Sequence, residues 1–356
     1  MDKIIQVGLI GFGAGGQTFH APVLTTVKGL QLVKIRAVQP EQVAVAKEKY
    51  PGASIVSSSE EIYNDKNIDL VVITTPNTSH YSLALQALEA GKNVVVDKPF
   101  TTNTAEADEL ISAAAKRKLI LSVYHSRRFD SDFYTVQKII KNDLLGRLVE
   151  LESRYDRFRN YLKPNAWREE DAPGTGILYD LGAHLIDQAQ ALFGLPVAVS
   201  ADIRIQRKGG KAVDSFEVIL HYPELKVSLK AGMLVREPLP RFILFGNSGS
   251  FVKYGLDVQE EALKSGCTPL TKNNWGTEPA NIWGTINTEI NGQHFIGKIE
   301  SEKGNYTDFY QNIYDTIIGK DTLMVTPLEA RNTVRIIELA MQSQLERRII
   351  DFSFFN

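Results

Sequence analysis

Three glycines near the N-terminus constrain the fold of this chain more than any other feature. Gly11, Gly13 and Gly16 form the pattern G-x-G-x-x-G, directly after the apolar run of residues 4–10 and directly before a helical run. Glycine permits a tight turn and lets an anion reach the unpaired N–H groups at the start of a helix. The pattern therefore predicts a strand–turn–helix unit that binds the pyrophosphate of a dinucleotide, with a turn that binds no ligand as the alternative. The predicted cofactor contacts in this loop are Gly11, Phe12, Gly13, Ala14, Gly15 and Gly16.

Short β-branched runs alternate with amphipathic runs from residue 3 to about 125, a pattern typical of βαβ units around a buried parallel sheet. The expected strands are residues 4–10, 30–38, 53–56, 68–75, 93–97 and 119–124. Apolar residues recur at helical spacing between them, and Gly91 lies where a helix would end. The sequence thus predicts a doubly wound parallel α/β domain over residues 1–125.

The second part of the chain, residues 126–356, predicts another α/β domain. Apolar and polar residues alternate in segments that predict a mainly antiparallel sheet: 148–158, 197–207, 215–222, 226–234, 241–249 and 250–255. A helix is expected over 176–194, ended by Gly194, and packed between the domains or on the sheet. Residues 265–305 predict loops or short strands. Residues 326–348 predict a long closing helix that could pack back toward the first domain.

The composition of the 356 residues excludes several classes of partner. Lys and Arg total 40 against 42 for Asp and Glu, so no overall charge attracts nucleic acid or an anionic membrane surface. Cys267 is the single cysteine and cannot form an internal disulfide. We find no secretory signal and no run long enough to span a membrane, and we expect a cytoplasmic protein.

The residues after the second strand bear on the choice between NAD and NADP. An acidic residue is usual about 20 positions after the glycine motif, but Val38 and Gln39 stand here. No carboxylate can bond a ribose 2′-OH or repel a 2′-phosphate. Lys34 and Arg36 could pair with that phosphate unless strand alternation points them to solvent, and Gln39 could bond a plain ribose. The sequence favours NADP, with NAD as the alternative.

Polar residues end three strands at the carboxyl edge of the sheet, where open α/β sheets bind ligands. Asp97 and Lys98 end the fifth strand, and this lysine could polarise a substrate oxygen and hold the nicotinamide ribose. Pro99 restricts Lys98 and permits a cis peptide bond. A surface lysine at a turn is the alternative.

The fourth and sixth strands end at the same edge. The further predicted cofactor contacts there are Thr75, Pro76, Asn77, His80 and His125. An ordinary turn followed by a capped helix is the alternative for residues 75–80. Arg127 and Arg128 come next after the sixth strand, and adjacent arginines more often face solvent.

Asp180 and His184 are four residues apart on the predicted helix 176–194, hence on one face. A histidine near neutral pKa can accept the proton that leaves an alcohol during its oxidation, and Asp180 could hydrogen-bond the substrate. A structural polar pair or a core histidine is the alternative. We expect no metal, because no third His or Cys ligand is nearby.

Five blocks of the sequence, in this order, resemble the Gfo/Idh/MocA oxidoreductases, the family of glucose-fructose oxidoreductase and inositol dehydrogenase. The blocks are GFGAGGQTFHAP, TTPNTSH, AGKNVVVDKPF, YHSRRFDSDF and GTGILYDLGAHLIDQ. The resemblance covers essentially the whole chain and is greatest to the NADP-dependent scyllo-inositol dehydrogenase branch. It implies an N-terminal Rossmann domain and a C-terminal α/β domain with a large, mainly antiparallel sheet. That sheet would join subunits into a homodimer or homotetramer.

The resemblance also implies roles for single residues. The family's Glu-Lys-Pro motif is here Asp97, Lys98 and Pro99, and its Asp-x-x-x-His pair is Asp180 and His184. The chain departs from the family at two places. His125 replaces a common Asn, and Val38 and Gln39 replace the Ser-Arg that NADP-using relatives often carry.

We therefore predict an NAD(P)-dependent dehydrogenase that acts on a secondary hydroxyl of a cyclic polyol or sugar, or on the matching ketone. In this hypothesis His184 accepts the hydroxyl proton, Lys98 stabilises the developing negative charge on oxygen, and Asp180 orients His184 or the substrate. Candidate substrate contacts are Arg128, Tyr155, Arg157, Trp167, Arg168 and Tyr179. The alternatives are a dinucleotide-binding sensor without chemistry and a redox-assisted glycosidase of the same architecture.

Overall fold

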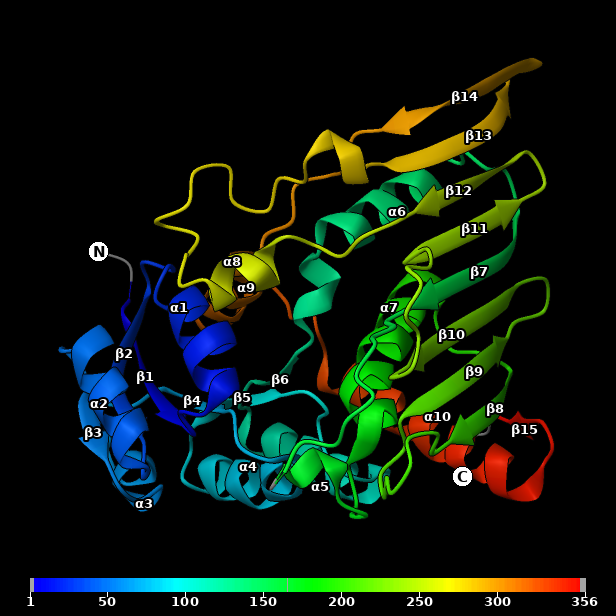
Figure 1. The fold of residues 1–356 in the computed structure, drawn as a ribbon. Coiled ribbons are helices and arrows are strands. Elements are labelled where there is room, and N and C mark those ends of the chain that lie inside the picture. The colour runs from blue at the N-terminus through cyan, green and yellow to red at the C-terminus, as the bar shows by residue number, and fades with distance from the viewer. Residues whose placement is uncertain (1–2, 165, 353–356) are drawn as a thin grey trace. The chain divides into compact units, whose positions relative to one another are not determined.

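The computed structural model describes residues 3–164 and 166–352, which fall into two compact units (Figure 1). Unit 1 comprises Met1–Ser126, Gln259–Trp275 and Asn305–Asn332. Unit 2 comprises Arg127–Val258, Gly276–Gly304 and Thr333–Asn356. Each unit is built around one β-sheet.

Unit 1 contains a six-stranded parallel sheet with the strand order β3-β2-β1-β4-β5-β6. Its strands are β1 Ile5–Ile10, β2 Leu30–Arg36, β3 Ser54–Val56, β4 Leu70–Ile73, β5 Asn93–Asp97 and β6 Leu121–Tyr124. The order reverses between β1 and β4, which is the place where doubly wound sheets bind ligands. The predicted doubly wound sheet is confirmed, with strands that are slightly shorter than expected.

Helices connect these strands, as predicted. They are α1 Ala21–Leu24, α2 Pro40–Lys49, α3 Glu60–Tyr63, α4 His80–Glu89 and α5 Thr104–Arg117, joined by α8 Gln259–Lys264 and α9 Thr307–Ile317 from later in the chain. Gly91 adopts φ +77° just after α4, as a helix-ending glycine does. One difference is that Gly16–His20 forms a wider π-helical turn before α1. Apolar spacing does not distinguish such a turn from an α-helix.

Unit 2 contains a nine-stranded sheet with the order β14-β13-β12-β11-β7-β10-β9-β8-β15. Its strands are β7 Leu148–Arg154, β8 Ala198–Arg204, β9 Ser215–His221, β10 Lys226–Gly232, β11 Phe242–Gly246, β12 Gly249–Lys253, β13 Gly284–Ile290, β14 Gln293–Ile299 and β15 Ile350–Asp351. Among the strands in residues 3–164 and 166–352, only β7 and β10 of this sheet pair in parallel, so the predicted mainly antiparallel sheet is confirmed.

Residues 284–299 form a longer hairpin than the loops or short strands expected there. Strands β13 and β14 have seven residues each and are joined by Asn291 and Gly292, both with positive φ. An Asn-Gly pair with this backbone is the preferred two-residue hairpin turn. The polar composition of the segment did not indicate these strands, because β14 lies largely exposed and β13 is buried only at Gly284, Ile286 and Thr288.

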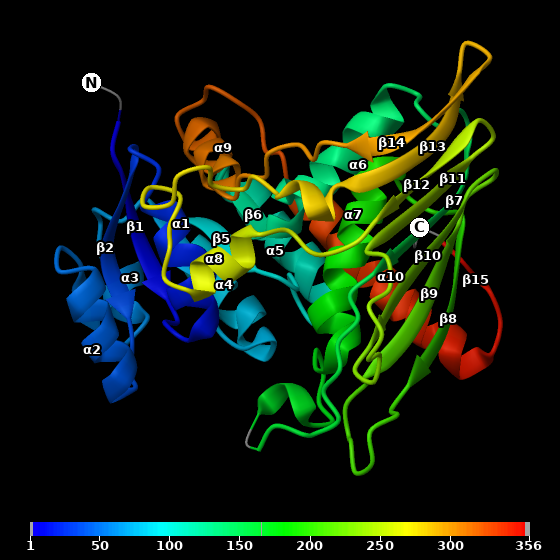
Figure 2. The same cartoon turned by 45° about the horizontal axis from the view of Figure 1, so that its top comes forward.

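Three helices cover one face of this sheet, namely α6 Ser131–Lys141, α7 Ala183–Phe193 and the later part of α10 Pro327–Glu346 (Figure 2). Leu185 and Ile186 of α7 belong to one buried core with Val218 and Leu229 of the strands. The expected helix over 176–194 is confirmed on the sheet, but it begins with a π-helical turn, Leu178–Gly182. The opposite face carries ion pairs between strands, such as Lys226 with Glu150 at 2.7 Å.

Candidate active site

The glycine loop of unit 1 leaves room beside its backbone for a ligand. A Cβ atom at Gly13 would meet no protein atom within 4 Å, whereas a Cβ at Gly16 would lie 2.5 Å from the carbonyl oxygen of Gly11. Gly11 adopts φ +95°, which favours glycine, and its carbonyl oxygen accepts a hydrogen bond of 2.5 Å from the Thr74 hydroxyl. The open space at the start of a helix fits the pyrophosphate of a dinucleotide.

The residues after β2 contain no carboxylate, as the sequence shows. Val38 is 59% exposed, and Gln39 precedes the first residue of α2. The Lys34 ammonium lies 2.7 Å from Asp65 and donates to the Glu61 carbonyl oxygen, so this lysine already has partners. Arg36 donates to the Ser57 carbonyl oxygen at 3.3 Å. The preference for NADP therefore stays a prediction.

Asp97 lies directly beside the glycine loop, and Lys98 follows it at the end of β5. The Asp97 Oδ1 atom accepts a 2.8 Å hydrogen bond from the Lys98 backbone N–H, and its Oδ2 atom would lie 3.3 Å from a Cβ at Gly15. The Lys98–Pro99 peptide bond is cis. Burial alone would raise the pKa of Asp97, but the contact with His20 and the positive charges nearby lower this pKa to about 2. The loop therefore borders a fixed negative charge that holds the turn at Lys98.

His20 belongs to this site, although the sequence assigned it no role. Its ring is fully buried, with Nδ1 2.6 Å from the Tyr310 hydroxyl and Nε2 3.5 Å from Asp97 Oδ1. The π-helical turn carries His20 inward, and Tyr310 comes from α9, almost 300 residues later. The histidine belongs to the block GFGAGGQTFHAP, but only the fold shows that Tyr310 is its partner.

The polar residues that end β4 and β6 are more buried than expected. His80 is fully buried, and its two ring nitrogens lie 2.8 Å from the Pro99 carbonyl oxygen and 2.9 Å from that of Thr75. Burial lowers the pKa of His80, although Asp97 and the two carbonyl groups raise it in part. Asn77 and His125 are also buried, whereas Pro76 is exposed. The His80 ring thus connects the turn after β4 with the turn that follows Lys98 through these two contacts.

In unit 2, His184 lies in the first turn of α7 and is 8% exposed. The Tyr155 ring lies edge-on to it, with the ring centroids 6.3 Å apart. The Arg241 guanidinium stacks 4.0 Å from the Tyr155 ring centroid, and the Tyr155 hydroxyl donates to Asp130 at 3.4 Å. Burial raises the pKa of Tyr155 to about 12, so its hydroxyl keeps its proton at neutral pH.

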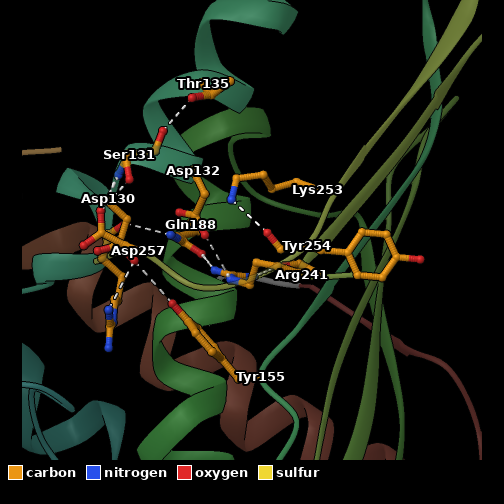
Figure 3. Close-up of polar contacts among 12 residues, drawn as sticks. Asp130, Ser131, Asp132, Thr135, Tyr155, Gln188, Arg241, Lys253, Tyr254 and Asp257 are labelled. Atoms are coloured by element: carbon orange, nitrogen blue, oxygen red, sulfur yellow. Dashed lines mark hydrogen bonds and ion pairs between the residues drawn. The ribbon is translucent and has the colours of Figure 1, made fainter. Parts of the chain in front are cut away.

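Arg241, which stacks on Tyr155, belongs to a buried polar network (Figure 3). Arg241 donates to Gln188 of α7 at 2.6 Å and lies 3.5 Å from Asp132 of α6. Burial raises the pKa of Asp132 despite the nearby positive charge of Arg241. Buried ionic groups are costly unless they are paired, so the network fixes α6 and α7 against Arg241, the residue that directly precedes β11.

Asp180 lines a cavity of about 210 Å³ that lies within unit 2. Its carboxylate is 3.9 Å from Arg157 and 3.7 Å from Arg168, and the Arg168 guanidinium lies 4.4 Å from the centroid of the Trp167 ring. The structure therefore brings together three of the predicted substrate contacts, Arg157, Trp167 and Arg168, around the predicted catalytic Asp180.

The other predicted substrate contacts do not line this cavity. Arg128 is buried and makes two hydrogen bonds of 2.7 and 2.8 Å to Asp187, so the expectation of a solvent-facing pair with Arg127 is wrong. Tyr179 is buried, with its hydroxyl 3.8 Å from the sulfur of Met341. The helix α7 supplies Asp187, and neither contact could be read from local sequence spacing.

The described residues are 3–164 and 166–352. No group of three or more His, Cys, Asp or Glu side chains there could hold a metal ion. No helix within those same residues is long and apolar enough to cross a membrane.

Two family models match the chain. Residues 5–125 match the model described as "Oxidoreductase family, NAD-binding Rossmann fold", and residues 137–352 match "Oxidoreductase family, C-terminal alpha/beta domain". The chain is 41% identical to the uncharacterized oxidoreductase YdgJ of Escherichia coli, over 98% of both chains. It is 39% identical to scyllo-inositol 2-dehydrogenase (NADP(+)) IolW of Bacillus subtilis, over 97% of this chain and 95% of that protein.

Solved structures of oxidoreductases are also similar to this chain. The putative oxidoreductase yvaA of Bacillus subtilis superimposes with a TM-score of 0.95 at 38% identity, covering 99% of both chains. A putative oxidoreductase of Bacteroides fragilis superimposes with a TM-score of 0.89 at 47% identity, covering 98% of this chain and all of that one.

Proposed function

The chain belongs to the Gfo/Idh/MocA oxidoreductase family, and on that premise we propose that it is an NAD(P)-dependent dehydrogenase of cyclic polyols or sugars. It would interconvert one secondary hydroxyl with the matching ketone. The names of two relatives support this substrate class, IolW and a myo-inositol 2-dehydrogenase of Thermotoga maritima that is 27% identical over 227 residues. The observation that carries the proposal is the open space at Gly13, with Asp97 and Lys98 at the same loop.

The proposed chemistry assigns one task to each of three side chains. The nicotinamide, when bound, supplies the acceptor or donor of the hydride. His184 takes the proton from the hydroxyl, a role that suits an imidazole whose ordinary pKa lies near neutrality. The Lys98 ammonium stabilises negative charge as it develops on the substrate oxygen. Asp180 orients the substrate hydroxyls or His184, and Tyr155 limits the movement of the His184 ring.

We propose NADP as the preferred cofactor. The absence of a carboxylate at Val38 and Gln39 supports this choice, because nothing there repels a 2′-phosphate. The name of IolW points in the same direction, since that relative uses NADP(+).

We also propose that subunits associate through the sheet of unit 2. In the part of the chain that the structure describes, helices pack on one face of this sheet, and the opposite face carries paired charges, including Lys230 with Glu152 at 2.8 Å and Glu217 at 3.2 Å. Light scattering should give the mass of a dimer or tetramer. The substitution Lys230→Glu, which places like charges opposite one another, should lower that mass.

An absorbance assay at 340 nm with inositols and aldoses, each with NAD and with NADP, tests the reaction. The variants Lys98→Ala and His184→Ala should each lower turnover by roughly a hundredfold or more, because general-base and oxyanion effects are of that order. Calorimetry should show little change in dinucleotide affinity for His184→Ala. Lys116→Ala serves as a control, since this residue is exposed on α5 and has no role in the proposed chemistry.

Two outcomes would contradict the proposal. Tight dinucleotide binding without turnover on any substrate would favour the sensor over the enzyme. Full activity of His184→Ala would remove this residue as the proton acceptor while leaving the reaction class in place.

A further inference from the structure

The cavity in unit 2 is lined by an excess of positive charge. Trp167 and the apolar residues Ile177, Val213 and Met233 form part of its wall. Its charged lining consists of five cationic and two acidic side chains, namely Arg157, Arg159, Lys163, Arg168 and Arg207 with Glu169 and Asp180. The whole chain has a net charge of −2, so this excess is a local property of the cavity.

One of the five cations is neutralised by the protein itself. Arg207 is buried, with its guanidinium 2.7 Å from a Glu169 oxygen and 2.9 Å from Asp214. The carboxylates of Glu169 and Asp214 both accept charge-assisted hydrogen bonds from Arg207. Glu169 is therefore not available to offset the remaining four cations of the lining.

Asp180 alone faces the other four cations among the charged lining residues. Its distances to Arg157 and Arg168, 3.9 and 3.7 Å, are longer than those of a direct hydrogen bond. Arg159 and Lys163 form no ion pair with any residue in the described ranges 3–164 and 166–352. The cavity thus holds about three positive charges that the protein does not balance.

The positive charges near the cavity affect the pKa of Arg157. Burial lowers the pKa of its guanidinium, and the positive charges of Arg159 and Arg127 lower it further, while Asp180 and Tyr155 act in the opposite sense. Its side chain is only 30% exposed, so water screens this repulsion incompletely. A negatively charged ligand would relieve the repulsion, and charge-assisted hydrogen bonds from the cations would offset the loss of its hydration.

We infer that this cavity binds a small polyol that carries an anionic group, a carboxylate or a phosphate, in contact with Arg157, Arg159 and Lys163. The inference rests on the proposed function and narrows its substrate class to sugar acids or sugar phosphates. Trp167 and the apolar lining offer a surface for the C–H face of the ring, and Asp180 accepts hydrogen bonds from ring hydroxyls. A cavity of about 210 Å³ admits a molecule of this size.

Pairs of substrates that differ only in charge provide the test. We would measure kcat/KM for glucose against glucuronate and glucose 6-phosphate, and for galactose against galacturonate, with the preferred dinucleotide. The anionic member of a pair should be favoured by roughly tenfold or more, and about 1 M salt should reduce this ratio because it shortens the screening length to about 3 Å. Comparison of kcat/KM for glucuronate with that for glucose 6-phosphate shows whether the cavity prefers a carboxylate or a phosphate.

Variants of the two cations without an ion pair show whether the preference arises in this cavity. Arg159→Gln and Lys163→Gln should lower kcat/KM for the anionic substrate by roughly threefold to thirtyfold and leave the neutral substrate nearly unchanged. Arg204→Gln is the matched control, because it removes one positive charge from an exposed pair with Asp202 on β8. This control should leave both values unchanged.

A binding measurement separates this inference from the proposed function. Glucuronate and glucose 6-phosphate should quench tryptophan fluorescence more strongly than glucose in the wild-type protein, and Trp167→Phe should remove the response. Such binding without turnover would contradict the dehydrogenase and support the anionic ligand. Turnover of neutral sugars at rates equal to those of their acids, with equal loss of both in Arg159→Gln, would overturn the inference and support the dehydrogenase.

Discussion

Gly13 and Gly16 belong to one motif, but the surroundings of the two residues differ, so a side chain would have a different effect at each position. A side chain at Gly13 would enter open space, so Gly13→Val should leave the folded protein intact. A side chain at Gly16 would meet the Gly11 carbonyl oxygen at 2.5 Å and the Thr74 hydroxyl at 2.9 Å. The first substitution should therefore affect ligand binding and the second should affect stability.

The expected magnitudes follow from these contacts. Loss of one charge-assisted hydrogen bond to the pyrophosphate costs about 1.5–3 kcal/mol, which lowers dinucleotide affinity by roughly tenfold to a hundredfold in Gly13→Val. In Gly16→Ala, the overlap costs about 3 kcal/mol, since backbone atoms cannot move aside easily. A gain of about 1 kcal/mol from replacing a helical glycine leaves a net loss of about 2 kcal/mol. At roughly 2–4 °C per kcal/mol, Tm should fall by about 4–8 °C.

Calorimetric titration with NADP and NAD and thermal unfolding of both variants measure these effects. A folded Gly13→Val protein with wild-type affinity would refute the assignment of the loop to the pyrophosphate. An unchanged Tm for Gly16→Ala would refute the packing argument, whatever its affinity.

Three further perturbations test other parts of the structure. Val38→Asp should shift the preference toward NAD by repelling a 2′-phosphate, measured as a ratio of Kd values, and a wild-type protein that strongly selects NAD would contradict this reasoning. The lowered pKa of Asp97, about 2, stabilises the fold by about 2 kcal/mol above pH 4, and this stabilisation is lost as pH falls from about 4 to about 2. Urea unfolding should accordingly show a pH dependence in that interval that is weaker in Asp97→Asn, and identical profiles would count against the ionised carboxylate. Arg241→Met should destabilise unit 2 by about 3–5 kcal/mol because Asp132 then lacks its buried partner, whereas the exposed Arg204→Met should cost less than about 1 kcal/mol.

The local patterns of the chain determine most of its secondary structure. Parallel strands that are buried on both sides have continuous apolar sequences. Strands with one polar face have alternating apolar and polar residues, so both sheets could be predicted. A period of 3.6 residues does not reveal the π-helical turns at Gly16–His20 and Leu178–Gly182. The hairpin 284–299, with its largely exposed strand β14, was not predicted either. The Asn291-Gly292 pair was the available signal for that hairpin.

Residue type and position along the chain were also enough to select Lys98, Asp180 and the glycine loop as candidates, because each stands at a strand end or helix start. Contacts between distant residues were decided only by tertiary structure. His20 meets Tyr310, Arg128 meets Asp187, and Arg157 and Arg168 meet at Asp180, from segments that no local period relates. Local sequence determines backbone conformation and which face is apolar, but the charge of a cavity depends on side chains that several strands and loops bring together.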